Sequence, residues 1–195
     1  MRLTSIAIVM ASVLALSACG SESAPTRTDI ANRLVNEGWV LFAAEDYTGA
    51  LQKFDEALDE LSEYPDAVAG RGWALAFLGS FAEARLEFVL ARELSGLDAD
   101  IWAGGAFVYA ALEDHDQVVV WAESALTLNS SWEFTHRPSI NSYHLNYVLA
   151  VAYWYRGSYH QCRQQVDILE PGVVHTTNPQ TLLADLQRLF ASPFS

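Results

Sequence analysis

The sequence predicts an all-α fold, a right-handed solenoid of about four helix-turn-helix repeats closed by a C-terminal capping helix. Three observations support this prediction. Small and aromatic residues recur every 34 residues, turn residues divide each period in two, and residues such as Ala50, Phe54 and Ala57 follow helical spacing. The composition agrees, because 51% of the 195 residues are hydrophobic, which is enough for one well-buried core.

The period is clearest in the first two repeats, which we expect at about 31–64 and 65–98. Turn signals at Glu45-Asp46 and Gly79-Ser80 divide each of them into two helices. The residues that recur after 34 positions are Gly38 as Gly72, Trp39 as Trp73 and Phe107, Tyr47 as Phe81, Ala50 as Ala84, Phe54 as Phe88, and Ala57 as Ala91 and Ala125.

Two later repeats are less regular. A third is expected at about 99–130, but Val118 and Ala122 stand where the earlier repeats have alanine and phenylalanine. A fourth is expected at about 141–171, after ten inserted residues at 131–140 that should bulge as a loop. A terminal helix at 179–191 presents leucines on one side and is expected to seal the end of the solenoid.

Region 29–195 is expected to form one domain, and about 29–171 of it resembles the tetratricopeptide repeat (TPR). The first repeat matches that pattern at Gly38, Ala50, Phe54 and Ala57, with Leu34 where the pattern has tryptophan. The resemblance implies that the first helix of each repeat lines a concave groove that commonly takes an extended peptide or a partner helix. The groove positions implied in this sequence include Asp66 and Asp100 and the aromatic residues Trp39, Phe42, Trp73, Phe77, Phe107, Tyr147, Trp154 and Tyr155.

These aromatic residues suggest binding, because rings in a concave surface bury much area and have few rotamers to freeze. The family's clamp for a C-terminal carboxylate is not implied here, since Trp39, Trp73 and Phe107 stand where its asparagines would fall. The same row of rings is also compatible with a self-covered core, in which the insertion or the terminal helix lies over them. Both arrangements stay open at this stage.

The amino terminus is expected to be a targeting segment rather than part of the fold. Arg2, a short apolar stretch and the sequence Leu16-Ser17-Ala18-Cys19 resemble a lipoprotein signal peptide ending in a lipobox. This resemblance implies a signal peptide at 1–18, a lipid anchor on Cys19 and a flexible spacer over 19–28. Gly20 rather than aspartate after the cysteine favours the outer membrane, with the protein facing the periplasm.

Several functional classes are disfavoured by composition and motifs. The formal net charge of −13 argues against a nucleic-acid partner, whose binders cluster lysine and arginine. The sequence has no H-E-x-x-H, C-x-x-C or G-x-S-x-G motif, and its five histidines are scattered, so no catalytic site, cofactor or metal is predicted.

The sequence therefore predicts a non-catalytic adaptor or assembly-factor lipoprotein of the cell envelope. Its partner would be a peptide or helix of an envelope protein, captured in the aromatic groove. The alternative is a small-ligand or glycan-binding lipoprotein, because stacked tryptophan and tyrosine also suit sugar faces.

Overall fold

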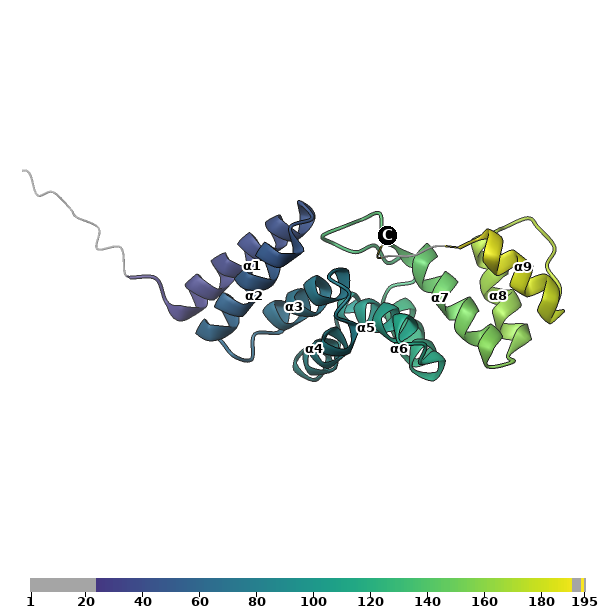
Figure 1. The fold of residues 1–195 in the computed structure, drawn as a ribbon, viewed down its shortest axis with the longest axis horizontal. Coiled ribbons are helices and arrows are strands. Elements are labelled where there is room, and N and C mark those ends of the chain that lie inside the picture. The colour runs from purple at the N-terminus through teal and green to yellow at the C-terminus, as the bar shows by residue number, and fades with distance from the viewer. Residues whose placement is uncertain (1–23, 191–193, 195) are drawn as a thin grey trace, which may run out of the picture.

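The structure, a computed structural model, describes residues 24–190 and Phe194, so the signal peptide expected at 1–18 and Cys19 lie outside the described residues. The described part contains nine helices and no strand (Figure 1). They are α1 (Arg27–Ala43), α2 (Tyr47–Glu60), α3 (Pro65–Phe77), α4 (Phe81–Leu94), α5 (Ala99–Ala111), α6 (His115–Leu128), α7 (Ser142–Tyr155), α8 (Tyr159–Leu169) and α9 (Pro179–Arg188).

The helix boundaries repeat with the period of the sequence. Helices α2, α4 and α6 begin at 47, 81 and 115, and helices α1, α3 and α5 end at 43, 77 and 111, so each step is 34 residues. Helix α7 ends at 155, which is 44 residues after the end of α5, because the insertion adds ten. The prediction of an all-α helical-repeat solenoid is confirmed.

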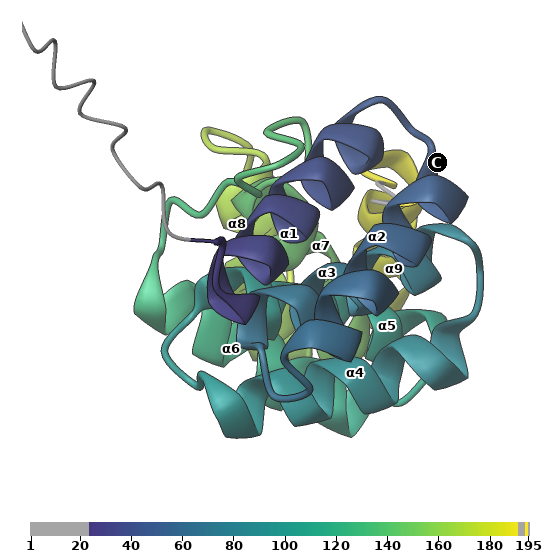
Figure 2. The same cartoon turned by 90° about the vertical axis from the view of Figure 1, so that its left-hand side faces the viewer.

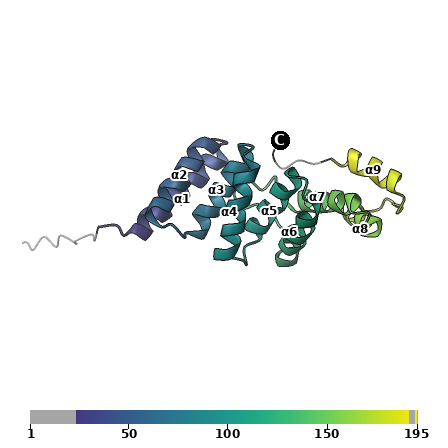
Figure 3. The same cartoon turned by 60° about the horizontal axis from the view of Figure 1, so that its bottom comes forward.

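The helices form two layers along the solenoid. Each odd-numbered helix from α1 to α7 packs against the next odd-numbered helix, while each even-numbered helix from α2 to α8 packs on its own repeat and on the one that follows. Helix α9 lies against α7 and α8 at the far end of the row (Figure 3). Seen from the α1 end, the repeats overlap behind one another (Figure 2).

Local signals set the helix ends. Thr26 and Asp29 form a reciprocal capping box that starts α1, and Asp46 and Asp114 accept backbone N–H bonds at the starts of α2 and α6. The turn inside each repeat contains one residue with positive φ, namely Glu45, Gly79, Glu113 and Gly157. No helix among the described residues is long and apolar enough to cross a bilayer.

Glycines let neighbouring repeats close around a large ring. A Cβ built on Gly38 or Gly70 would lie 2.7 or 2.4 Å from Phe54, and one built on Gly104 would lie 2.3 Å from Phe88. Gly70 and Gly104 are themselves 34 residues apart, a repeat that the sequence analysis did not single out. Each ring is therefore held between the first helix of its own repeat and that of the next.

The third repeat fills the equivalent space with a ring from a different position. Ala122 occupies the position that Phe54 and Phe88 hold in the earlier repeats, and the fully buried ring is supplied one residue earlier by Trp121. A Cβ on Gly105 would lie 2.1 Å from this indole, so Gly105 makes room for it. Cys162 in α8 is buried, and burial raises the pKa of its thiol to about 12.

A buried histidine joins the last two helices. The side chain of His175 is 2% exposed, with Nδ1 at 3.0 Å from Asp167 and Nε2 at 3.1 Å from Glu170. Glu170 also accepts two hydrogen bonds from Arg188 of α9. Burial lowers the pKa of His175, but the hydrogen bonds to Asp167 and Glu170 and the nearby charge of Asp185 raise it more, so the net shift is upward.

This arrangement predicts that the α8–α9 end is more stable in mild acid. Because the pKa of His175 is raised in the folded state, its stabilisation is complete below the ordinary value of 6.5 and is lost as the pH rises through the folded-state value. We expect the urea midpoint of the wild type to fall between about pH 6 and pH 8.5. The dependence should weaken in His175→Gln and persist in His160→Gln, which changes an exposed histidine of α8. Equal pH profiles for all three proteins would contradict this assignment.

Candidate functional site: the concave face and its insertion segment

A row of aromatic rings runs along the inner layer of helices. Trp39 of α1, Trp73 of α3 and Phe107 of α5 occupy equivalent positions and are all buried. Trp73 is 0% exposed and contacts both Phe107 and Phe88 through its ring. The rings that were expected to line the groove therefore do meet on one face.

The insertion segment, residues 131–140, lies along this row. The ring of Phe134 stacks on Trp73 with centroids 4.1 Å apart, and His136 stacks on Trp39 at 3.7 Å. The ring centroids of Trp132 and Phe107 are 6.0 Å apart. In Figure 1 the green loop between α6 and α7 extends back towards α1. The segment thus crosses the repeats in the order third, second, first.

Residues 132–134 of the segment are extended, and a turn follows at Thr135 and His136. Trp132 and Phe134 are buried and His136 is half-buried, whereas Glu133 and Thr135 between them are exposed. Such alternation is the pattern of an extended chain with one side against a surface. The chain therefore places its own insertion segment where the family resemblance implies a peptide.

Polar contacts fix the base and the tip of the loop that the segment forms. The indole N–H of Trp132 donates to Asp100 at 2.6 Å, and the Ser142 N–H donates to the carbonyl of Trp132 at 2.7 Å. At the tip, the Arg137 guanidinium donates to the Tyr47 hydroxyl at 2.5 Å and to Glu45 at 3.1 Å. These bonds hold the segment across the whole width of three repeats.

The predicted groove residues are consequently divided into two groups. Trp39, Phe42, Trp73 and Phe107 are covered in this structure, because the insertion segment packs over them, which is one of the two arrangements considered from the sequence. Of the remaining four, Phe77 also meets the segment, because the Arg137 guanidinium lies 5.2 Å from its ring centroid. The described partners of the other three lie outside the segment. Phe77 contacts Phe194, Tyr147 contacts Phe190, Trp154 donates to the carbonyl of Pro179, and Tyr155 is 62% exposed and stacks on His115.

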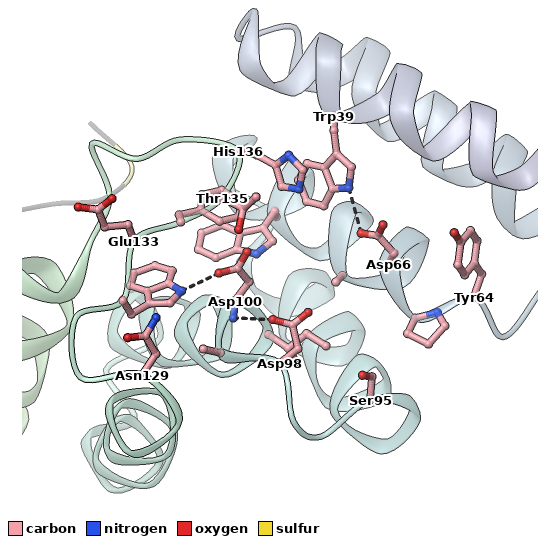
Figure 4. Close-up of a pocket in the computed structure, with 17 residues that line it drawn as sticks. Trp39, Tyr64, Asp66, Ser95, Asp98, Asp100, Asn129, Glu133, Thr135 and His136 are labelled. Atoms are coloured by element: carbon pink, nitrogen blue, oxygen red, sulfur yellow. Dashed lines mark hydrogen bonds between the residues drawn. The ribbon is translucent and has the colours of Figure 1, made fainter.

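A cavity of about 520 Å³, here called the acidic pocket, opens beside the insertion segment (Figure 4). It lies between the starts of α3 and α5 and the covered rings, and Asp66, Asp98 and Asp100 surround its space. Its lining residues are Trp39, Tyr64, Pro65, Asp66, Ala69, Trp73, Ser95, Asp98, Ala99, Asp100, Ile101, Asn129, Trp132, Glu133, Phe134, Thr135 and His136. The insertion segment provides five of them, so it builds part of this wall.

Hydrogen bonds from two indole N–H groups position two carboxylates of the acidic pocket. The indole N–H of Trp39 donates to Asp66 at 3.0 Å, as that of Trp132 does to Asp100. Burial raises the pKa of Asp100 above its ordinary value, and the hydrogen bonds from Trp132 and Thr135 offset only part of this rise. Burial likewise lowers the pKa of His136, which favours its neutral form.

A second cavity, here called the apolar pocket, is lined by none of residues 131–140. It measures about 300 Å³ and is formed by the inner surfaces of α5, α6 and α7 together with Phe190 and Phe194. Phe107 and Tyr147 of the predicted groove line it, as does the exposed Ala111. The concave face thus retains two openings of opposite chemical character.

The arrangement offers binding surfaces in both pockets. In the part of the chain that the structure describes, no three histidine, cysteine or carboxylate side chains are grouped so as to hold a metal ion. Sequence reasoning placed Asp66 and Asp100 on the groove but missed Asp98, Trp132 and Phe134. The available signal was the alternation of ring-bearing residues with other, polar residues over Trp132–His136. The sequence analysis interpreted this stretch only as a loop.

Comparisons with known proteins identify the fold. No protein-family model matches the sequence, and no curated protein matches it. The described helices superpose on solved TPR structures. YrrB, described as a TPR protein with an unusual peptide-binding site, matches with a TM-score of 0.63 and 15% identity over 86% of this chain and 93% of that chain.

Two further solved structures give the same result. A double mutant of MamA matches with a TM-score of 0.62 and 14% identity over 83% of this chain and 94% of that chain. The first TPR domain of Spaghetti (RPAP3), bound to the HSP90 peptide SRMEEVD, matches with a TM-score of 0.52 and 21% identity over 54% of this chain and 83% of that chain. The chain therefore has the helical-repeat fold of tetratricopeptide-repeat proteins.

Proposed function

We propose that this chain is a non-catalytic adaptor that holds a segment of another protein against its concave face, and that a lipid on Cys19 tethers it in the cell envelope. One observation carries the binding part of the proposal. The insertion segment covers the aromatic row but leaves open the acidic pocket, which it helps to line, and the apolar pocket, which it does not line. Such openings, lined by rings and a few polar groups, are where ligands bind to preformed surfaces.

Similar proteins support a peptide as the ligand. The RPAP3 domain is bound to a peptide, and YrrB has a peptide-binding site. The RPAP3 ligand SRMEEVD carries three acidic residues. The acidic pocket of this chain would repel such a ligand, so the partner segment proposed here differs in charge.

Site-specific photo-crosslinking tests the binding surface. A photoreactive phenylalanine analogue is placed at Thr135 beside the acidic pocket, at Ala111 beside the apolar pocket, and at Leu86 on the outer helix α4. All three positions are exposed, so the analogue should not disturb the core. We expect the same envelope protein to be crosslinked from Thr135, Ala111 or both, and not from Leu86. Crosslinks of equal yield from Leu86, or from none of the positions, would contradict the proposal.

The tether is tested in the same cells. The lipobox-like sequence Leu16-Ser17-Ala18-Cys19 supports lipid attachment, and several acyl chains on one residue would anchor the protein firmly. We expect Cys19→Ser to move the protein from the membrane fraction to the soluble fraction and to lower the crosslinking yield. Retention of Cys19→Ser in the membrane fraction would contradict the anchor.

Truncation of the buried rings does not provide a clean binding test. Trp73 and Phe107 are core residues in this structure, and removing a buried ring costs about 3–5 kcal/mol of stability. We therefore expect Trp73→Ala with Phe107→Ala to unfold the solenoid. Exposed positions are the right places for probes.

A glycan ligand is the second class considered from the sequence. Sugars bind to the open faces of aromatic rings, but His136 already stacks on Trp39 and Phe134 on Trp73. These contacts favour a protein segment. Saturable binding of an oligosaccharide, without a protein crosslink, would favour the glycan alternative.

A further inference from the structure

The lining of the acidic pocket has an unbalanced charge. Four carboxylates surround it, those of Asp66, Asp98, Asp100 and Glu133, and none of the lining residues is lysine or arginine. His136 does not compensate, since burial keeps its pKa low. A positive group entering the pocket would therefore be attracted without displacing a cation of the protein.

The shape of the pocket excludes the simplest cation. No cluster among the described residues is suited to a metal ion, so the carboxylates do not converge on one point. They are spread around a cavity of about 520 Å³ instead. A space of this size with separated acceptors suits an extended organic cation with several N–H donors, such as a guanidinium group.

The walls add two features that a bare acidic cluster lacks. The half-buried ring of Tyr64 lines the same cavity, and a cation over the face of this ring gains a further attraction. Trp73 is also on the wall, is fully buried, and has an indole N–H with no hydrogen-bond partner in the described structure. A backbone carbonyl of a bound segment would provide the missing acceptor.

We propose that the acidic pocket binds the side chain of an arginine or lysine in the partner's segment, with arginine preferred. This proposal rests on the proposed function, because it specifies the chemistry of the segment that the adaptor holds. Asp66 and Asp98 receive the charged group at the exposed side, and Asp100 receives it at the half-buried side. The insertion segment acts as the wall that orients Asp100 through Trp132.

The test uses the whole protein and two matched peptides. Acetylated and amidated Gly-Gly-Arg-Gly-Gly is compared with the same peptide carrying citrulline, which keeps the shape of arginine but is neutral. The readout is the NMR signal of each indole N–H. Trp39 and Trp132 donate to carboxylates of the pocket, whereas Trp154 donates to the carbonyl of Pro179 far from it and serves as the internal control.

We expect the arginine peptide to shift the Trp39 and Trp132 signals saturably and to leave Trp154 unchanged. Loss of a charge-assisted hydrogen bond should make the citrulline peptide bind about tenfold more weakly or worse. Equal binding of the two peptides, or no shift with the arginine peptide, would overturn the proposal. Spermidine is a third arm, and tighter binding of this free amine than of the peptide would overturn the assignment to a protein segment.

Amide variants separate charge from structure. Asp66→Asn, Asp98→Asn and Asp100→Asn each keep an oxygen acceptor for the existing hydrogen bonds, and the triple variant should retain its fold while losing the shifts. The matched control, Asp59→Asn, removes an exposed charge from outer helix α2 and should bind normally. Equal loss in both would indicate general attraction to an acidic protein and would overturn the site.

The two proposals fail in different ways. If the pocket assignment is wrong, the peptide titration fails while the crosslink from Ala111 beside the apolar pocket remains. If the chain is not an adaptor, the crosslinks are absent whatever the titration shows.

Discussion

Gly104→Ala is expected to lower the free energy of unfolding by about 2 kcal/mol, although alanine is the better helix former. The exchange gains up to about 1 kcal/mol of helix propensity. The new Cβ, however, would lie 2.3 Å from two carbons of the Phe88 ring, far inside van der Waals contact. Phe88 is fully buried and cannot move aside without separating α3 from α5. Urea unfolding followed by circular dichroism measures the change.

Two further variants isolate the cause. In Gly72→Ala the new Cβ lies 3.2 Å from Glu87 and 3.3 Å from the Phe88 ring, so a shift of a few tenths of an ångström suffices and stability should change little. Phe88→Leu should destabilise the wild type but cost much less when added to Gly104→Ala, because the smaller side chain relieves the clash. Equal midpoints for Gly104→Ala and Gly72→Ala would show that the contact with Phe88 is not limiting.

Phe134→Ala is expected to destabilise the protein by about 3 kcal/mol, even though residue 134 belongs to a loop. Its ring is 0% exposed, stacks on Trp73 and meets Trp39 and Phe42 edge-on. Removing it leaves a cavity over the row of rings and detaches the insertion segment. We expect a lower urea midpoint together with greater quenching of tryptophan fluorescence by acrylamide.

The control for this prediction lies in the same segment. Ser139 is exposed, and Ser139→Ala should leave both the midpoint and the quenching unchanged. A Phe134→Ala variant with wild-type stability would mean that the insertion segment is not part of the core, and the aromatic row would then be accessible to a partner.

The sequence predicted the repeats well because the residues that define them act locally. Turn positions such as Glu45 and Gly79 and caps such as Asp46 end and start helices through their own neighbours, so a period in the sequence becomes a period in the structure. The use of Trp121 in the third repeat, in place of the phenylalanine of the earlier repeats, could not be predicted in the same way. Trp121 fills the space that Ala122 leaves, which depends on the paired glycine at 105 in another helix.

The path of the insertion segment was outside the reach of the sequence for a different reason. A loop that bulges into solvent and a loop that folds back over the helices have the same local composition. Which of the two forms depends on contacts with residues up to 92 positions away, such as that between Arg137 and Glu45. The acidic pocket could not be predicted for the same reason, since Trp132, Glu133 and His136 complete it only after the segment has folded back.

The contact between Arg137 and Glu45 has a consequence for how the chain folds. In an ordinary solenoid each repeat touches only its neighbours, so stability is nearly a sum of local terms and the ends can unfold independently. Here the insertion segment, which follows the third repeat, contacts the first repeat. The first and third repeats are therefore connected directly as well as through the second. We therefore expect α1 to α6 to unfold as one cooperative unit, with α8 and α9 fraying separately. Folding should be slower than in an open array, because the higher contact order requires a long loop to close before this direct connection forms.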